Sequence, residues 1–286
     1  MLDSSALQGF KPLIVSPSHD GKYFQNYVLS MFNFISHAHQ INMSVQLLAH
    51  AGESLITRAR NNCVATFLQN PQWTHLFWID ADIGFSVEAA TRLLQSGHDI
   101  AAGVYPLKRE IWPEEGLPAG MSKEQFEAKY TRYTVNTVGN AQNEVHLHVD
   151  ADGFFQVTEA PTGFMCIRRE VFTRMMAHYP ELQYVPDSAG VEDQGLHYRF
   201  FDVMVHPLTR RYLSEDYGFC KLWADMGGTI HVDAQSNLSH QGQKLYRGDY
   251  AAALLSNPSA AVGAPKGGKI YVHTAAELCS NPSGPM

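Results

Sequence analysis

Short apolar runs alternate with amphipathic stretches along the N-terminal part of the chain. The apolar runs are rich in branched and aromatic residues and end at polar or turn-forming residues, which is typical of buried strands. They lie at residues 12–16, 42–49, 75–80 and 99–106. Stretches with apolar residues at helical spacing lie between them, at 23–38, 53–70 and 86–97. This β-α-β-α-β-α-β order predicts an α/β fold with a mostly parallel central sheet and helices on both faces.

The apolar positions also predict which face of each helix packs on the sheet. The expected stripes are Tyr27, Met31, Phe34 and Ile35 in the first helix, and Leu55, Ile56, Ala59, Cys63 and Phe67 in the second. Asn70 and Pro71 should end the second helix, because the residue before a proline disfavours helical geometry. Ser86 can cap the third helix, and Gly97 can end it.

The alternation is interrupted between residues 108 and 155, where turn formers surround a short helical stretch at 122–130 and an alternating stretch at 144–150. This segment is predicted to be an insertion. The α/β pattern then returns as a strand running into a helix, a further helix and a last strand, at 163–176, 214–228 and 229–234. Beyond residue 248 the chain is rich in Ala, Ser, Gly and Pro, which predicts a loosely packed tail. The predicted organisation is one domain over 1–247 followed by a tail over 248–286.

Two carboxylates stand at the end of the most apolar strand, in the stretch FWIDADIGF. Residues i and i+2 of an extended segment point the same way, so Asp80 and Asp82 can aim at one point. An ionised carboxylate is costly to bury unless it is paired or binds a metal. Two hard oxygen ligands suit Mg²⁺ or Mn²⁺, with substrate phosphates and water completing the shell. The alternative is that one aspartate caps the next helix and the other is solvated.

These residues, with SEDYGF and LSHQG downstream, resemble the GT-A glycosyltransferases over about residues 10–247. Members of that family have a Rossmann-like fold, use nucleotide-sugar donors and bind a metal through a DxD motif. The resemblance implies that Asp82 ligates the metal and that Asp80 contacts the ribose or the metal through water. It also implies that His240 completes the metal shell, and that the 108–155 insertion lies on the acceptor side.

The resemblance also assigns the catalytic base. SED opens a helix, where Ser214 can cap the first turn and acids favour the positive end of the helix dipole, so a structural role alone is an alternative. In inverting enzymes of the family an acidic pair here supplies the base, which implies Asp216 ahead of Glu215. In a retaining enzyme the acid would orient the sugar or the acceptor instead.

Further candidates are predicted around the donor. The family cradles the nucleoside after the first strand, here at Ser16, Pro17 and Ser18, although a plain turn is the alternative. Arg58 and Asn62 share one helix face, and Arg58 can contact a phosphate or order the base pocket; a solvated face is the alternative. The resemblance places Thr162 and Gly163 beside the donor sugar. Lys108 is a phosphate contact or a solvated lysine, and Arg247 is a candidate for neutralising the departing diphosphate.

Composition limits the other functional classes. The 286 residues are 45% hydrophobic and 17% charged, which allows a sizeable buried core. A formal charge of −7 argues against a nucleic-acid-binding protein. Four widely spaced cysteines without a CxxC pair predict reduced thiols rather than a zinc site, and the first three have apolar neighbours. No apolar run reaches about 18 residues and no signal peptide is evident, so a cytoplasmic protein, or one peripheral at the membrane, is expected.

The predicted reaction is sugar transfer from a UDP- or GDP-sugar to a glycan or lipid-linked acceptor, with Mn²⁺ or Mg²⁺ as cofactor. Three alternatives stay open. One is a metal-dependent phosphoesterase, although that chemistry generally needs a denser His/Asp cluster than this sequence shows. A nucleotidyltransferase acting on a sugar phosphate shares the layout and the metal, but usually has a glycine-rich basic loop after the first strand, and SPSHDGKY has one glycine and one lysine. The third alternative is a non-enzymatic module that binds a sugar or a protein partner.

Overall fold

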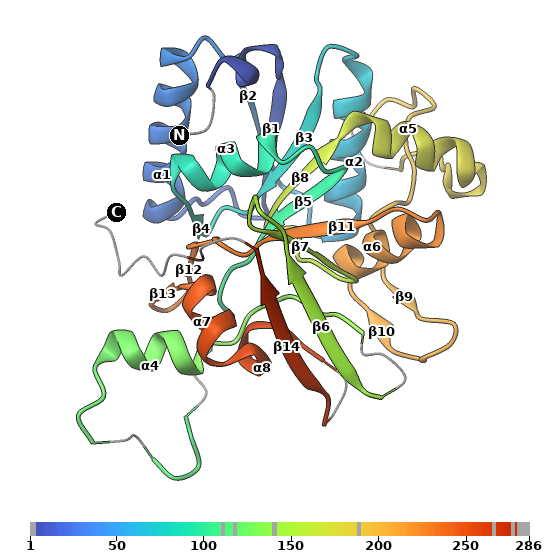
Figure 1. Ribbon diagram of the computed structural model, residues 1–286. Coiled ribbons are helices and arrows are strands. Elements are labelled where there is room, and N and C mark those ends of the chain that lie inside the picture. Colours follow the sequence, from blue (N-terminus) through green and yellow to red (C-terminus); the bar gives the residue numbers. More distant parts are fainter. Residues whose placement is uncertain are drawn as a thin grey trace.

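A seven-stranded sheet forms the centre of the structure, a computed structural model that describes residues 4–109, 112–116, 119–138, 142–187, 190–264, 267–275 and 278 (Figure 1). The strand order is β2-β1-β3-β8-β5-β11-β7. The strands are β1 (Pro12–Ser18), β2 (Gln46–Ala51), β3 (His75–Ile79), β5 (Ile100–Gly103), β7 (Phe154–Val157), β8 (Phe164–Arg168) and β11 (Ile230–Asp233).

The sheet is mixed, with one prevailing direction. β2, β1, β3, β5 and β11 run the same way, whereas β8 lies antiparallel between β3 and β5, and β7 lies antiparallel to β11. The predicted α/β fold with a mostly parallel sheet is therefore confirmed at that level. The insertion of β8 between two parallel strands was not predicted, because the order of strands along the chain does not fix their order in the sheet.

Helices cover both faces, as the apolar pattern predicts. α1 (Gln25–Gln40) and α3 (Val87–Gln95) pack on one face, and α2 (Ile56–Gln69), α5 (Arg169–His178) and α6 (Glu215–Asp225) on the other. Strand β3 shows the reason, because its fully buried side chains alternate between the two core clusters. Leu76 and Trp78 join the cluster under α2, and Phe77 and Ile79 join the cluster under α1 and α3.

Three residues of the predicted stripes are exposed. Ile35 of α1 is 43% exposed, and Leu55 and Ile56 are 52% and 41% exposed. Helix α2 begins only at Ile56, with Leu55 as its N-cap, so these two residues precede the turns that reach the sheet. Ala59, Cys63 and Phe67 carry the contact instead and are buried as predicted.

The C-terminal segment is more ordered than predicted. It contains α7 (Tyr250–Ser256), α8 (Pro258–Ala261) and β14 (Lys269–Thr274), and β14 pairs in parallel with β6 (Glu144–Val149) of the insertion. Tyr250, Ala251, Ala253 and Leu254 have no exposed surface. The prediction of loose packing is wrong for this part, because α7 places the Tyr250 ring in the core beside Tyr133 and Phe155.

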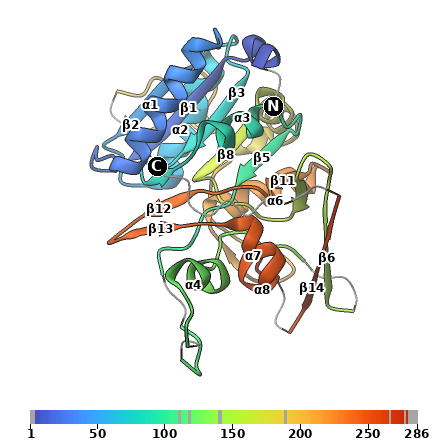
Figure 2. The ribbon, with the colours of Figure 1, turned by 60° about the vertical axis from the view of Figure 1, so that its left-hand side comes forward.

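Smaller elements complete the described chain. A second sheet, of order β13-β12-β4, joins β4 (Ile83–Gly84), β12 (Ser239–Gln241) and β13 (Leu245–Arg247). Figure 2 shows this hairpin between the α/β layer and helices α4 (Lys123–Tyr130) and α7. The remaining elements are η1 (Ser4–Gly9), η2 (Pro180–Leu182), β9 (Met204–Val205) and β10 (Tyr212–Leu213).

Two predictions from composition can be compared with the structure. Cys63, Cys166 and Cys220 are buried free thiols, as predicted, whereas Cys279 lies outside the described residues. No helix among the described residues combines the length and the apolar character that a membrane-spanning helix requires.

Candidate active site

The candidate site lies where the strand order changes direction. β1 is flanked by β2 on one side and β3 on the other. The crossover through α1 leads from β1 to β2, and the crossover through α2 leads from β2 back past β1 to β3. Ligands of α/β sheets bind beyond the carboxyl ends of strands at such a point. Asp80 is the first residue after β3, and its backbone N–H donates to the Gly163 carbonyl at 2.9 Å. This bond connects the end of β3 to the start of β8.

The β4–β12 pairing brings His240 to Asp82. Ile83, next to Asp82, pairs with His240, and Gly84 pairs with Ser239. The Asp82 carbonyl accepts from the Gln241 N–H at 2.9 Å and from the Asn26 amide at 3.0 Å. Gly84 is required here, because a Cβ would lie 2.4 Å from the Ser239 hydroxyl. Two residues that are distant in the sequence are thereby held on one small sheet.

The imidazole of His240 is oriented as a metal ligand would be. Its Nδ1 lies 2.8 Å from the Pro106 carbonyl, which can only accept, so Nδ1 carries the proton. In the neutral ring Nε2 then has a lone pair, and it faces the Asp82 Oδ1 at 3.5 Å. A lone pair facing a carboxylate needs a cation or a proton between them. The pair therefore fits a divalent cation, and the Pro106 contact is the kind that orients metal-bound histidines.

The predicted ligand set is not assembled as a whole. Among the described residues, no three or more His, Cys, Asp or Glu side chains are grouped so that they could hold a metal ion. Asp80 is engaged elsewhere, and the ammonium group of Lys108 is hydrogen-bonded to the Asp82 Oδ2. Burial raises the pKa of Asp82, but the hydrogen bonds and charges that the doubly protonated form of His240 and the Lys108 ammonium direct at it outweigh that effect, and the net pKa is lowered. In that form of His240 a proton on Nε2 takes the place that a metal ion would take between the two side chains. Asp82 is thus held ionised by cations.

A buried arginine, which we did not single out from the sequence, links three parts of the site. Arg60 of α2 is 4% exposed. Its Nη2 lies 3.4 Å from the Asp80 Oδ1, and its Nε lies 3.2 Å from the Glu215 Oε1. The guanidinium stands over the Trp78 ring at 5.0 Å, and its Nη1 is buried without a hydrogen-bond partner in the described structure.

The acidic pair at the start of α6 is divided by these contacts. Glu215 binds Arg60, while Asp216 accepts a hydrogen bond from the Ser214 hydroxyl. Burial raises the pKa of Asp216, and the charge of Glu215 raises it further. Burial likewise raises the pKa of Asp80, although Arg60 opposes that effect. Asp216 is therefore the carboxylate of the pair that is not engaged by an arginine.

Thr162 and Gly163 lie behind the aspartates. Thr162 is 1% exposed, and the Gly163 N–H donates to the Tyr105 hydroxyl at 3.2 Å. A Cβ on Gly163 would overlap that hydroxyl, so the close approach that the glycine permits is to Tyr105. The Tyr105 ring also contacts His240 edge to face at 5.0 Å. In the present structure these residues pack behind Asp80 and His240 and hold them in place through Tyr105.

The expected nucleoside residues lie within a strand rather than after it. β1 continues to Ser18, because its pairing with β2 extends through Ser16, Pro17 and Ser18. The Ser16 side chain is fully buried and shares a 2.6 Å hydrogen bond with the Tyr27 hydroxyl. The expectation of a loop at these positions is wrong, and only Pro17 and Ser18 are partly accessible.

Arg58 and Asn62 differ in environment. Arg58 forms a two-fold ion pair with Glu53, at 2.6 and 2.8 Å. Asn62 is 8% exposed, and its side-chain oxygen has no hydrogen-bond partner in the described structure. Helix α2 therefore directs Arg60, rather than Arg58, to the aspartates.

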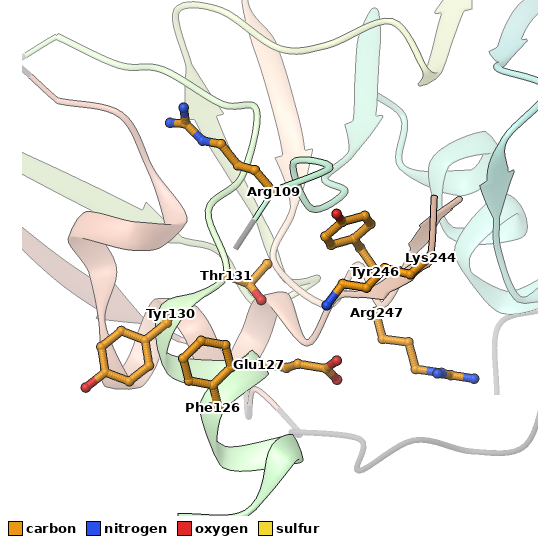
Figure 3. A pocket seen from close by; sticks show the side chains of 8 residues that line it. All are labelled: Arg109, Phe126, Glu127, Tyr130, Thr131, Lys244, Tyr246 and Arg247. Atoms are coloured by element: carbon orange, nitrogen blue, oxygen red, sulfur yellow. The ribbon is translucent and has the colours of Figure 1, made fainter. Parts of the chain in front are cut away.

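Arg247 lies beside the site, in a pocket between α4 and the β12–β13 hairpin. Figure 3 shows Lys244 and Tyr246 of the hairpin facing Thr131 and Glu127, while the guanidinium groups of Arg109 and Arg247 lie apart. Phe126 and Tyr130 complete the lining. Tyr246 pairs with His240, and Arg109 follows Lys108, so the pocket adjoins the Asp82 side of the site.

A signal for Arg60 was present in the sequence. Arg60 lies between Ala59 and Cys63 of the predicted buried stripe, so it falls on the side of α2 that faces the sheet. A charged residue in that position needs a partner, and the unpaired carboxylates at the end of the neighbouring strand were the available ones.

Comparisons with known proteins leave the family open. No family model and no curated protein matches the chain. The structure of A197 from STIV is similar with 13% identity, a TM-score of 0.43, and coverage of 83% of this chain and 94% of that one. The structure of GalNAc-T7 with UDP, GalNAc and Mn²⁺ has 10% identity, a TM-score of 0.37, and coverage of 81% and 44%. The 4-diphosphocytidyl-2C-methyl-D-erythritol synthase from Anaerococcus prevotii has 9% identity, a TM-score of 0.31, and coverage of 76% and 99%.

Proposed function

We propose that this protein is a metal-dependent glycosyltransferase. It transfers a sugar from a nucleotide-diphosphate donor, a UDP- or GDP-sugar, to an acceptor hydroxyl. The acceptor is a glycan or a lipid-linked molecule. The observation that carries the proposal is the pair formed by Asp82 and the His240 lone pair at the carboxyl end of the sheet. A carboxylate and an imidazole that face each other in this way suit a cation, and a cation here suits a pyrophosphate ligand.

Asp82 and His240 would hold Mn²⁺ or Mg²⁺, with Asp80 as a third ligand or as a contact to the ribose. When bound, such an ion supplies Lewis-acid stabilisation of the charge on the leaving diphosphate. The Lys108 ammonium is hydrogen-bonded to Asp82. It can move to a phosphate oxygen of the donor when a metal ion takes its place on the carboxylate. Arg247, exposed in the adjoining pocket, is proposed to pair with the departing diphosphate.

Asp216 is the proposed catalytic base of an inverting reaction. A base must be near the acceptor and must be able to take its proton, and a raised pKa improves proton uptake. Glu215 is less suited, because the Arg60 guanidinium binds its carboxylate. Asp216 takes the proton from the acceptor hydroxyl as that oxygen attacks the anomeric carbon of the sugar.

Arg60 is proposed as a positioning residue. From α2, its guanidinium holds Asp80, which follows β3, and Glu215 of α6 at the same time, so it fixes the distance between the two sides of the site. Arg58, Asn62, Pro17 and Ser18 stay proposals for the nucleoside end. Ser16 would require a new rotamer, because its hydroxyl faces Tyr27. Thr162 and Gly163 are proposed to line the sugar side next to Asp80.

The test is nucleotide binding with and without metal. Thermal shift and calorimetry would be measured with UDP, GDP and their sugar conjugates, in Mn²⁺, Mg²⁺ or EDTA. We expect stabilisation by one nucleotide class that requires the metal, and loss of that effect in Asp82→Asn. Asp225→Asn is a matched control, because it removes a half-exposed carboxylate at the far end of α6.

The products separate the remaining alternatives. Release of a nucleoside diphosphate with sugar transfer supports the proposal. Release of pyrophosphate from a nucleoside triphosphate and a sugar phosphate would show a nucleotidyltransferase instead. If no nucleotide binds under any metal condition, the proposal is wrong, and a non-enzymatic binding module becomes the better description.

A further inference from the structure

We propose that the outer face of the β6–β14 ribbon is a second metal site, selective for Zn²⁺, Ni²⁺ or Cu²⁺, built from His146, His148 and His273. The two strands pair in parallel, with His146 opposite Tyr271 and His148 opposite His273. The opposite face of β6 is in the core, where Val145, Leu147 and Val149 are at most 3% exposed. The alternation of β6 therefore places its histidines on the solvent face, as the sequence predicts.

Two of the imidazoles already lie at the separation of metal ligands. The His146 Nδ1 and the His273 Nε2 are 3.0 Å apart. The rings are within 9° of parallel and their centroids are 5.3 Å apart, so they meet edge to edge rather than face to face. Two nitrogens on one tetrahedral Zn²⁺, at about 2.0–2.1 Å each, lie about 3.3 Å apart. The separation needs to change by only a few tenths of an ångström, but each ring must also turn so that the two lone pairs converge on one point, since the nitrogens now face each other along the line between the rings.

Metal binding displaces the proton that His146 Nδ1 and His273 Nε2 share, and the other ring nitrogen of His146 can carry a proton instead. In the structure one of the two nitrogens donates and the other accepts. The second nitrogen of His146, Nε2, lies 3.5 Å from the Glu144 carboxylate. When the His146 proton is on Nε2, it faces Glu144 and leaves Nδ1 with its lone pair toward His273. A carboxylate behind a histidine in this way orients metal-binding imidazoles and raises their basicity.

His148 supplies the third ligand by rotation. Its ring centroid lies 4.8 Å from that of His273 and 6.5 Å from that of His146. The three rings do not converge in the present structure, which agrees with the lack of a three-ligand group among the described residues. Two histidines at i and i+2 on one strand and a third on the neighbouring strand can reach one ion, because directly opposed Cβ atoms lie about 5 Å apart.

The chemistry of the ligands decides which metal binds. Imidazole nitrogens favour zinc, copper and nickel, whereas Mg²⁺ and Mn²⁺ favour carboxylates and water. The ribbon site is therefore distinct from the Asp82 site and does not depend on the proposed function. His146 and His273 are 127 residues apart in the sequence, so a shared ion would fasten the C-terminal strand to the insertion.

The experiment titrates the full chain with ZnCl₂ and NiCl₂ by calorimetry in an Asp82→Asn background, so that the Asp82 site does not contribute. We expect one ion per chain. Glu144→Gln should weaken binding about tenfold, as loss of an outer partner does. His146→Ala and His273→Ala should weaken it more than Glu144→Gln. His39→Ala is the control, since this exposed histidine lies on α1, away from the ribbon.

A second measurement follows the strand itself. Zn²⁺ should slow hydrogen exchange of the β14 amides in the parent chain and leave it unchanged in the His146→Ala, His273→Ala double variant. All the substituted side chains are at least partly exposed, so circular dichroism should show native folding in each variant. Equal zinc affinity in the parent and the double variant, or no uptake by the parent, would overturn the proposal.

Discussion

Asp80 and Asp82 are separated by one residue, yet they belong to two different electrostatic environments. Asp80 contacts Arg60, which also holds Glu215; we call these three residues the inner cluster. Asp82 contacts Lys108 and faces His240; we call these three the outer cluster. The pKa of Asp80 is raised, mainly by burial, whereas the pKa of Asp82 is lowered by its two cationic neighbours against the effect of burial.

The two clusters differ in whether their cation can exchange. The cation of the inner cluster belongs to a buried helix and has a 5% exposed side chain, so it cannot leave. The cation of the outer cluster ends a flexible chain that is 38% exposed, so it can exchange. The inner cluster therefore fixes the geometry of the site, and the outer cluster is the part where a cation can be replaced.

The largest expected effect comes from removing the fixed cation. Arg60→Met leaves Asp80 and Glu215 without their arginine, and breaking a buried ion pair on one side costs about 3–5 kcal/mol. Urea unfolding should show a loss of that size in the free energy of unfolding. Arg58→Met, which breaks the partly exposed pair with Glu53, should cost less than about 1 kcal/mol. Equal losses would show that the inner cluster contributes no more to the free energy of unfolding than the Arg58–Glu53 pair does.

A smaller effect is expected from substitutions in the outer cluster. Asp82→Asn should weaken the apparent Mn²⁺ affinity in nucleotide binding at least about tenfold, which is about 1.4 kcal/mol. Asp80→Asn should weaken it less, because Arg60 already engages that carboxylate. Calorimetric titration of Mn²⁺ at saturating nucleotide measures both. If Asp80→Asn weakened it as much as Asp82→Asn, the two clusters would act as one metal site.

Lys108→Ala should have a smaller effect with the opposite sign. The ammonium competes with a metal for Asp82, and partly exposed ion pairs contribute about 0.2–1 kcal/mol. Removing it should therefore raise the Mn²⁺ affinity by up to about fivefold in a titration without nucleotide, the state in which Lys108 contacts Asp82. A loss of nucleotide binding that Mn²⁺ does not restore would show instead that Lys108 itself is the cation of the site.

The sequence was sufficient to predict the parts of the site that depend on local pattern. The apolar run of β3 and the i, i+2 spacing placed Asp80 and Asp82 at a strand end. The resemblance added His240, and the β4–β12 pairing brings it to Asp82. The two buried faces of β3 follow from alternation alone.

What the sequence did not reveal depends on contacts between distant segments. Arg60 was missed although its place beside the buried stripe was a signal, because the packed fold is what brings it to both Asp80, after β3, and Glu215 of α6. Pro17 and Ser18 were expected to lie beyond the strand, because the extent of the β1–β2 pairing is not visible in β1 itself. The burial of Tyr250 required knowing that β6 and β14 close the core beside it.

The smallest expected effect is a shift in the pH dependence of sugar transfer. It tests how the charge of Glu215 affects the pKa of Asp216. If Asp216 is the base, the rate of sugar transfer rises with pH as that carboxyl loses its proton. Burial and the Glu215 charge raise its pKa above the ordinary 3.8, so the acid limb of the profile lies above that pH. Glu215→Gln removes the like charge and leaves the Arg60 charge to act on Asp216, so its pKa falls and the acid limb should move to lower pH.

The measurement is the pH dependence of kcat/KM for the parent, for Glu215→Gln and for Glu170→Gln, whose side chain is 64% exposed on α5. The exposed control should leave the limb in place, because its charge is screened by water and lies on another helix. A limb that moves upward in Glu215→Gln would mean that the titrating group is not Asp216. A limb that disappears altogether would make Glu215 the base, and Arg60, which binds its carboxylate, would then contact the base directly.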